Sequence, residues 1–391
     1  MSFPPTEEQA NIIAKKKDTE KMLIKARAGC AKTDTGVRIS KAYPKRKFKF
    51  IVFGKKNAEE FAQKLPSNAS GSTRHSFCNS FIKQRYQLDK SGFKMFKIIS
   101  KDPEYNFKNP LFSKEESFAA RENLNSMKDL VGLLKNSFIQ PTMVDVETII
   151  NHFGISFSIP MEQVCSDAID FLLTSDDDTK ELDYNDMVRL PIISGSIKAN
   201  FDEFFLDEAQ DNTPISNELL KQVRKQGCSV TCCGDDFQAI MGFCGADSNS
   251  LNNIITAIEP EIMPLTVNFR CGKNIIAEAQ RFVPDIKAWD QSPDGIVSYS
   301  KTDDFMKKFS NGDCALSRFN RVIIPICFRL IREGKKATIQ GRDFGSMLKA
   351  LVAGFKATTI DGFYEAIDKW KDRQLEKPKS LSVSDAIEDK F

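Results

Sequence analysis

The sequence predicts an α/β fold built on a parallel sheet, and three observations lead to this prediction. Short apolar runs typical of buried strands recur along the chain, each followed by a loop or a helical pattern. Such alternation is typical of a parallel sheet with helices on its faces. A loop containing glycine and a pair of adjacent carboxylates directly follow two of the runs, where parallel sheets bind ligands. The predicted strands are 21–25, 47–53, 204–206, 229–233 and 263–267.

The length of the chain predicts more than one packed unit. Its 391 residues exceed the size at which a single core usually keeps growing, and 41% hydrophobic with 28% charged residues is an ordinary globular composition. We expect a first domain over 1–282, interrupted by a helical insertion at 91–180. Strand patterns at 314–316 and 337–340 flank a helical pattern at 321–332, which predicts a partial second α/β domain over 283–391.

Charge and cysteine usage exclude several classes of protein. The net charge of +3 is the balance of 56 basic and 53 acidic side chains, so any site for a polyanion must be local. The stretch 41–56 mixes basic and aromatic residues, and it is either a nucleic-acid contact or the solvated basic edge of a strand. Ten cysteines without a C-x-x-C pair, and only two histidines, argue against a zinc ribbon.

The sequence also bears on location. We find no amino-terminal signal pattern and no apolar run of about 18 residues, so we expect no membrane partner and a cytoplasmic protein with reduced thiols. This expectation includes a bacterial or phage-infected host cell as the setting, and oligomeric state cannot be predicted from the sequence.

The loop at 26–33 has the context of a phosphate-binding loop. It follows the apolar run at 22–24 and precedes a helical pattern, so backbone N–H groups at a helix start would face anionic oxygens. We expect Lys32 to lie along the β- and γ-phosphates and the Thr33 hydroxyl to bind Mg²⁺. The strict pattern has glycine where this chain has Ala26 and Ala31, so an accidental A-K-T sequence stays an alternative.

Two adjacent acids follow the apolar strand at 204–206. Asp207 would hold Mg²⁺, and Glu208 would orient or deprotonate an attacking water. The alternative is a strand followed by an acidic helix cap.

These motifs together resemble those of superfamily 1 DNA helicases of the UvrD/PcrA/Rep type, particularly the compact phage-encoded members. The run DEAQD at 207–211 is a specific match, and PTEEQ at 5–9 is similar to the Q motif. The resemblance implies a P-loop NTPase (RecA-like) sheet with a partial second RecA-like domain, with ATP and Mg²⁺ as cofactors. It implies that Gln9 reads the adenine edge and that the phosphates lie on Ala28, Gly29, Cys30, Ala31, Lys32 and Thr33.

Two later segments resemble the family's motifs III and IV. The run 234–247 is the longest match, and in it Gln238 would sense the γ-phosphate and Phe243 would stack on DNA. In the run LTVNFR at 265–270, Phe269 would stack on adenine. Arg270 would neutralise charge on the γ-phosphate in the transition state; as an alternative, it forms a surface ion pair.

The resemblance also implies contacts with single-stranded DNA. Phe53 and Lys55 lie in a segment that resembles motif Ia, and Thr73, Arg74 and His75 lie in one that resembles a T-F-H-S-F segment. Arg74 stands where the family has phenylalanine, and arginine can stack on a base or bind phosphate. An ordinary loop histidine is the alternative for His75.

The family's segments T-x-H-x-x-K-G-L-E and V-A-x-T-R do not occur in this chain. The resemblance as a whole nevertheless leads us to expect an ATP-dependent helicase or translocase on single-stranded DNA, with replication or repair proteins as candidate partners. The alternatives are a degenerate or truncated homologue that binds DNA and nucleotide without unwinding, and the motor of an ATP-dependent nuclease. The positions that depart from the family pattern are Arg27, Ala31, Arg74, Met241 and Cys244.

Overall fold

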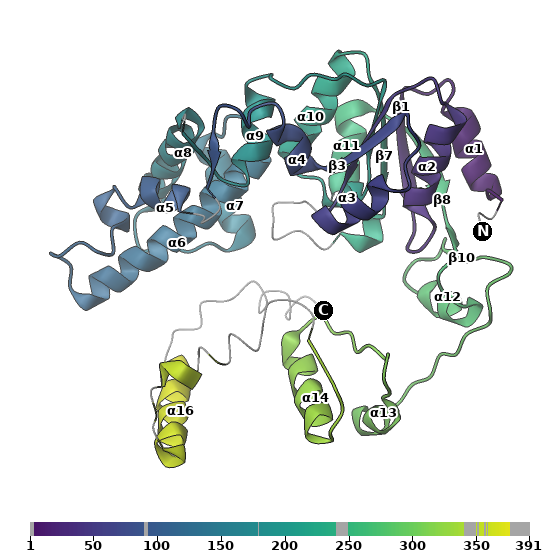
Figure 1. The fold of residues 1–391 in the computed structure, drawn as a ribbon. Helices are drawn as coiled ribbons and strands as arrows, with labels where there is room; N and C mark the ends of the chain where they lie inside the picture. The colour runs from purple at the N-terminus through teal and green to yellow at the C-terminus, as the bar shows by residue number, and fades with distance from the viewer. Residues whose placement is uncertain are drawn as a thin grey trace. The chain divides into compact units, whose positions relative to one another are not determined.

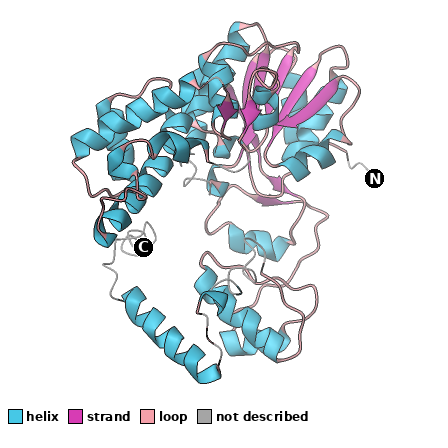
Figure 2. Cartoon of the chain, turned by 60° about the vertical axis from the view of Figure 1, so that its left-hand side comes forward, coloured by secondary structure: helices cyan, strands magenta, loops and turns pink. Residues whose placement is uncertain are grey.

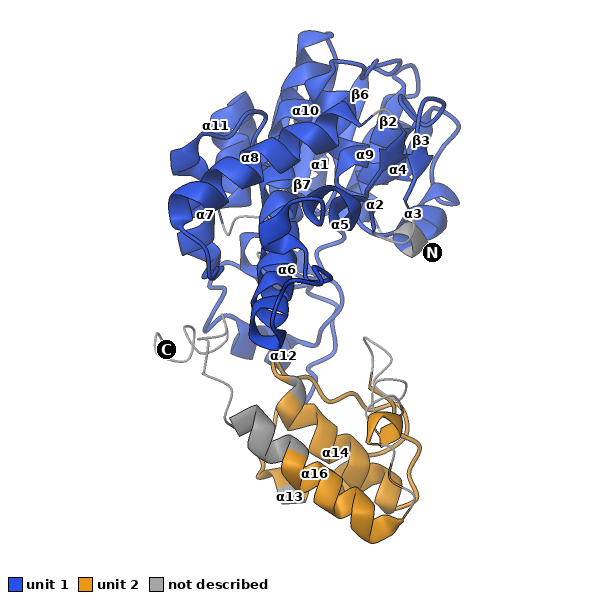
Figure 3. Cartoon of the chain, turned by 90° about the vertical axis from the view of Figure 1, so that its left-hand side faces the viewer, with its two compact units in different colours: residues 1–296 blue, residues 297–391 orange. Residues whose placement is uncertain are grey.

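The computed structural model describes residues 4–89, 93–178, 180–239, 249–339, 349, 352–355, 357 and 359–375. They belong to two compact units, Met1–Ile296 and Val297–Phe391, which Figure 3 colours separately. Each unit is described by itself.

A six-stranded sheet forms the centre of the first unit, in the order β3-β2-β6-β7-β1-β8. Every pair of neighbouring strands runs parallel, which confirms the predicted α/β fold with a parallel sheet. Because the strands are parallel, their carboxyl ends share one edge of the sheet and their amino ends share the other. The strands are β1 (Lys21–Ala26), β2 (Phe48–Val52), β3 (Ala69–Thr73), β6 (Glu203–Leu206), β7 (Ser229–Gly234) and β8 (Glu261–Leu265).

Helices cover both faces of this sheet (Figures 1 and 2). Side chains alternate along a strand, so Phe204 and Leu206 enter one buried cluster while Phe205 enters the other. The cluster around Phe205 is closed by α1 (Glu7–Lys15), α2 (Lys32–Ala42) and α3 (Lys55–Ala62). The opposite cluster is closed by α4 (Arg74–Asn79), α9 (Asp186–Ile193), α10 (Pro214–Lys225) and α11 (Ser250–Ile258).

A block of helices lies between β3 and β6 in the sequence and beside the sheet in space (Figure 1). It has a hydrophobic core of its own, in which Met127, Leu130 and Leu134 meet Ile150 and Leu172. Capping boxes at Ser113 and Thr142 begin two of its helices. The helices are α5 (Lys94–Ile99), α6 (Lys114–Ser137), α7 (Met143–Phe153) and α8 (Met161–Asp177), with the two-stranded ladder β4 (Gln87–Leu88) and β5 (Glu181–Leu182) at the junction.

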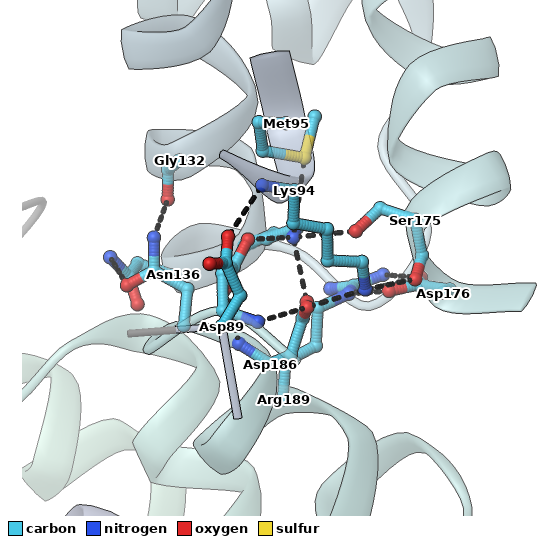
Figure 4. A network of polar contacts seen from close by, with 12 residues as sticks. Asp89, Lys94, Met95, Gly132, Asn136, Ser175, Asp176, Asp186 and Arg189 are labelled. Atoms are coloured by element: carbon cyan, nitrogen blue, oxygen red, sulfur yellow. Dashed lines mark hydrogen bonds and ion pairs between the residues drawn. The ribbon is translucent and has the colours of Figure 1, made fainter. Parts of the chain in front are cut away.

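Buried charges join this helical block to α9 on the sheet face (Figure 4). Asp186 of α9 accepts from the Lys94 ammonium at 2.7 Å and forms an ion pair with Lys135 of α6 at 2.6 Å. Arg189, one helical turn further along α9, donates to both oxygens of Asp176 on α8. Lys94, Lys135, Asp186 and Arg189 are each at most 1% exposed, so the charges are satisfied by one another rather than by water.

The first unit extends to Ile296, beyond the boundary expected at Phe282. After α12 (Lys273–Ala279) the chain returns to the sheet, where β10 (Lys287–Ala288) pairs with β9 (Val267–Asn268). Asp285 also binds Arg27 next to the sheet. A short parallel ladder and an ion pair keep the segment after Phe282 in the first compact unit, and the division into two motor domains stays a prediction.

The described part of the second unit is helical. It contains α13 (Thr302–Lys308), α14 (Asn320–Arg332) and α16 (Ile360–Leu375), and α14 coincides with the helix predicted at 321–332. No strand occurs at 314–316 or 337–339, and residue 340 is outside the described residues. A short apolar run becomes a strand only beside a hydrogen-bonded partner strand. Across both units, no helix among the described residues has the length and apolar character needed to span a bilayer.

Candidate nucleotide site and adjoining groove

The loop between β1 and α2 turns through two left-handed residues. Gly29 has φ +68° and Ala31 has φ +59°. Helix α2 then begins at Lys32, and no side chain caps its first turn. The first N–H groups of an α-helix have no partner within the helix, so this end of α2 presents donors and a partial positive charge to an anion. The loop thus has the backbone form that the phosphate-binding prediction requires.

Ala31 adopts the backbone conformation that glycine would adopt without strain. For an L-residue with a Cβ the left-handed conformation costs about 1 kcal/mol. The methyl group at Ala31 is therefore accommodated, at the expense of local backbone strain. Strain of this kind is typical of functional loops.

Gly29 cannot carry a side chain in this arrangement. A Cβ there would lie 2.4 Å from Nδ2 of Asn268 and 3.1 Å from Cβ of Arg270. Asn268 Nδ2 donates to the Ala28 carbonyl at 2.6 Å, and its Oδ1 accepts from the Arg270 N–H at 2.8 Å. Asn268 therefore holds the loop against the motif IV segment, a role that the sequence analysis missed because no local pattern marks it.

The predicted magnesium and phosphate residues meet at the carboxyl edge of the sheet. Thr33 Oγ1 donates to Asp207 Oδ2 at 3.0 Å, and the Lys32 ammonium pairs with Oε2 of Glu208. The pKa of Lys32 is raised: burial acts to lower it, but the Glu208 carboxylate outweighs burial. Thr33 and Asp207 are 174 positions apart in the sequence, and Lys32 and Glu208 are 176 positions apart. The fold brings the two members of each pair into direct contact.

The two carboxylates differ in their surroundings. Burial, and then repulsion from Glu208, raises the pKa of Asp207 to about 6. Glu208 takes a left-handed backbone conformation with φ +52°, and its N–H donates to Asp207 Oδ1 at 3.0 Å. A buried carboxylate with a raised pKa favours the approach of a cation. Asp207 has the character expected of a metal ligand.

Hydrogen bonds connect Glu208 with the motif III segment. Gln210 Nε2 donates to Glu208 Oε2 at 2.8 Å, while Gln210 Oε1 accepts from the Asp235 N–H at 3.0 Å. Gln238 Nε2 in turn donates to Asp235 Oδ2 at 2.6 Å. This chain of contacts passes the end of β7 at Gly234, where a Cβ would lie 2.8 Å from Gln210 Oε1. Gln238 is thus linked to the predicted catalytic carboxylate through Asp235 and Gln210.

Arg27 in the loop is fully engaged. It donates through Nε and Nη2 to the two oxygens of Asp285 at 2.7 Å each, and through Nη1 to Asp236 at 2.6 Å. Its guanidinium carbon lies 4.8 Å from the ring centre of Phe237. Burial acts to lower the pKa of Arg27, but the two carboxylates raise it. In the sequence, Arg27 is notable only because it departs from the family pattern. In the fold, it joins the loop to the segments that contain Asp236 and Asp285.

Phe269 and Arg270 lie beside the loop. The Phe269 N–H donates to the Gly29 carbonyl at 3.0 Å, and its ring centre lies 5.6 Å from that of Trp289. Arg270 is exposed, and its guanidinium has no hydrogen bond or ion pair within the described residues. The Arg270 guanidinium is therefore available for an anion. The alternative, a surface ion pair, is not formed with any of the described residues.

Gln9 lies near the same loop with its amide occupied. Its Nε2 donates to Thr35 on α2 at 2.9 Å, and its Oε1 accepts from the Thr6 N–H at 3.1 Å. The side chain is only 2% exposed. The neighbouring Glu8 accepts from the N–H and the hydroxyl of Thr266 at 2.6 Å each. A role for Gln9 at adenine stays a prediction, and it requires these internal bonds to exchange.

A groove of about 690 Å³ adjoins this site, and we name it the carboxyl-edge groove. The predicted DNA-binding residues Phe53, Thr73, Arg74 and His75 all line it, together with Asp207, Glu208, Asp211 and Tyr184. Phe53 is 45% exposed. The Lys55 backbone begins α3 at this edge, but its side chain is outside what the structure describes, as is Phe243.

His75 and Arg74 have distinct electrostatic surroundings in this groove. Burial, and then the charge of Arg74, lowers the pKa of His75 to about 4, so the imidazole is neutral near pH 7. The His75 ring lies edge-on to Tyr184, with centres 6.4 Å apart. Arg74 Nη1 donates to Asn212 Oδ1 at 3.2 Å. The neutral His75 ring beside Tyr184 suits stacking on a base, in a groove that carboxylates also line.

Comparison with known proteins gives consistent matches to helicases. Residues 6–258 match the family model described as UvrD/REP helicase N-terminal domain. A probable DNA helicase II homolog of Mycoplasma genitalium is 24% identical over 276 residues, covering 62% of this chain and 36% of that protein. The F-box DNA helicase protein 1 of Schizosaccharomyces pombe is 24% identical over 293 residues, covering 68% of this chain and 31% of that protein. The chain thus spans about a third of the length of these relatives.

Proposed function

Because the chain belongs to the UvrD/REP helicase N-terminal domain family, we propose that it provides the ATP-dependent motor of a helicase or translocase acting on single-stranded DNA. The relatives that it matches are named as DNA helicases. One observation carries the proposal: the Lys32–Glu208 and Thr33–Asp207 contacts bring the loop and the carboxylate strand end together.

The residues present fit a nucleotide and a hard cation. Thr33 and Asp207 offer a hydroxyl and a carboxylate oxygen side by side, which is the ligand chemistry that Mg²⁺ prefers. The uncapped start of α2 and the Lys32 ammonium suit phosphate oxygens. Bound Mg²⁺ would neutralise charge on the phosphates.

The contacts suggest an order of events at the site. Lys32 pairs with Glu208, and on binding phosphate Lys32 would release the Glu208 carboxylate to orient or deprotonate a water. Gln210 would hold Glu208 in place through its 2.8 Å bond. Arg270 lies next to Gly29 of the loop, and its guanidinium would neutralise charge that develops on the γ-phosphate.

The carboxyl-edge groove provides the link with DNA. Glu208 and Asp211 line the same groove as Phe53, Arg74 and His75. DNA in this groove would therefore contact side chains next to the nucleotide carboxylates. We propose that this shared wall is how strand binding and ATP turnover affect each other.

The test is ATP hydrolysis by the full chain with and without single-stranded DNA. We expect Lys32→Ala to weaken nucleotide binding, and Glu208→Gln to bind nucleotide while turnover falls by about 100-fold or more. Lys225→Ala serves as the matched control, since Lys225 is exposed at the end of α10. Hydrolysis by Lys32→Ala equal to that of the unaltered chain would overturn the enzymatic proposal. Binding of both ligands with no turnover would instead reduce it to a binding function.

A further inference from the structure

A second groove, of about 700 Å³, lies where β2, β3 and β6 begin, and we name it the amino-edge groove. It collects part of the basic stretch predicted at 41–56. Residues 44–49 line one side and residues 198, 200 and 201 line another. The proposed function does not use this groove, because the nucleotide residues and the carboxyl-edge groove lie at the opposite ends of the strands.

The four lysines of this groove have no ion-pair partner among the residues that the structure describes. Lys45, Lys47, Lys49 and Lys198 line it, and none of its described lining residues is Asp or Glu. None of the four ammonium groups forms an ion pair within the described residues. The nearest acid in sequence, Asp202, already accepts from the Lys47 backbone N–H at 2.7 Å. The groove therefore has a local excess of positive charge on a chain whose overall charge is nearly balanced.

Lys49 gives a second, independent indication of an anion. It is partly buried on β2, and its ammonium lies 5.5 Å from the ring centre of Phe77. Burial lowers the pKa of Lys49, and no carboxylate offsets this effect. A desolvated ammonium next to an aromatic ring gains more from an incoming anion than a solvated one would.

The groove also has an apolar part. Phe81 and Phe201 line it, and both are only partly buried. Basic side chains that follow a backbone, combined with aromatic rings, are typical of surfaces that bind single strands without sequence preference.

The two grooves are separated by the length of the strands. Phe48 pairs with Ala69 and Glu203 at the amino ends, whereas Asp207 follows the carboxyl end of β6. A five-residue strand is about 16 Å long. A ligand in the amino-edge groove would therefore not compete directly with nucleotide at Lys32.

We propose that the amino-edge groove binds the phosphodiester backbone of a single-stranded nucleic acid, as a site separate from the carboxyl-edge groove. Lys45, Lys47 and Lys198 provide exposed contacts to phosphates, and Lys49 provides a partly buried one. The groove anchors a second stretch of strand on the same unit and so adds affinity without entering the nucleotide site.

The test compares two triple variants of the full chain. The first is Lys45→Gln, Lys47→Gln and Lys198→Gln, and the control is Lys225→Gln, Lys273→Gln and Lys301→Gln, three exposed lysines outside this groove. Binding of a long oligothymidylate is measured as a function of salt. Three lost phosphate contacts should reduce the slope of log K against log salt by about 2, because each contact on a single strand contributes about 0.7.

The outcomes are distinguishable. Support requires a reduced slope in the first variant, an unchanged slope in the control, and unchanged ATP turnover without DNA in both. An equal loss in both variants, or no loss in either, overturns the proposal. Vesicles containing phosphatidylserine provide the other polyanion: if the first variant loses vesicle binding while it retains oligothymidylate binding, the nucleic-acid assignment is wrong. Neither result bears on the Lys32→Ala test of the proposed function.

Discussion

Arg27 and Asp285 are 258 positions apart in the sequence and form two parallel hydrogen bonds, each 2.7 Å long. Paired bonds between a guanidinium and a carboxylate are stronger and more directional than single ones. Through them, the segment after α12 is attached to the loop that precedes α2. Together with the β9–β10 ladder, this contact keeps the segment after Phe282 in the first unit.

The Arg27–Asp285 pair should contribute measurably to stability. We expect a double-mutant cycle of Arg27→Gln and Asp285→Asn to give a coupling of about 1 kcal/mol in the free energy of unfolding. The value stays modest because Asp285 is 50% exposed. The exposed pair Asp34 and Arg38 on α2 is the matched control, with an expected coupling below about 0.5 kcal/mol. Equal couplings in the two cycles would contradict a special role for Arg27.

Gly29 and Gly154 provide a matched pair of left-handed glycines. Gly154 has φ +61° and nothing within 4 Å of an added Cβ, so Gly154→Ala should cost about 1 kcal/mol of unfolding free energy from backbone strain alone. Gly29→Ala adds a clash with Asn268. We expect it to cost at least about 2 kcal/mol and to weaken nucleotide binding at least about tenfold. Similar losses in both variants would show that the Asn268 contact is unimportant.

Ala31→Gly should relieve the left-handed strain in the same loop. The folded state gains about 1 kcal/mol, while the added flexibility of glycine in the unfolded chain returns part of this gain. We therefore expect stability within about 1 kcal/mol of the unaltered chain and nucleotide affinity that is equal or higher. Calorimetric titration with a non-hydrolysable nucleotide measures the affinity, and a clear decrease would show that the methyl group contributes to the site.

His75 should titrate well below its ordinary value of 6.5. Because its pKa in the folded chain is about 4, the unfolded chain binds more protons between pH 4 and 6.5. The unfolding free energy therefore rises with pH across this window and falls on acidification. Titration of the His75 ring by NMR measures the pKa, with His75→Asn to assign the signal. A midpoint near 6.5 would contradict the described burial, and His75→Asn should flatten the pH dependence of stability.

Lys135 tests the buried charges at the junction of the helical block. It is 0% exposed, and although burial acts to lower its pKa, the carboxylates of Asp186 and Asp183 raise it. Lys135→Met removes the ion pair of Asp183 and leaves Asp186 with Lys94 alone, so we expect a loss of about 3–5 kcal/mol in urea unfolding. Lys128→Met on the same helix should change stability by about 0.5 kcal/mol or less. Equal effects would show that the pair is replaceable.

The most deeply buried strands are the most evident in the sequence. β6 is buried along its whole length and β7 along nearly all of it, and both appear as continuous apolar runs. β3 was missed because it reads ASGST and pairs only with β2 at the edge of the sheet. The opposite error occurred at 314–316, where an apolar run found no strand to pair with. Strand formation there depended on partners that a local pattern cannot reveal.

The candidate site was predicted where chemistry follows a strand directly. Asp207 and Glu208 directly follow a predicted strand, Lys32 and Thr33 close the loop that follows another, and the fold brings them into contact. Residues that act across the chain were missed. Asn268 and Asp285 reach the loop only after folding, and nothing around them in the sequence indicates a partner some 240 or 258 positions away.

The strand order makes the site depend on a residue at the end of β7. β7 lies between β1 and β6, so the Lys32–Glu208 contact passes over the end of a strand that contributes no side chain to it. The last residue of β7, Gly234, leaves the space that Gln210 occupies. A side chain at 234 would therefore displace Gln210 and Ala209, which follow Glu208 directly, while every charged and hydroxyl residue of the site stayed intact. A sequence comparison limited to those charged and hydroxyl positions would therefore not detect the damage.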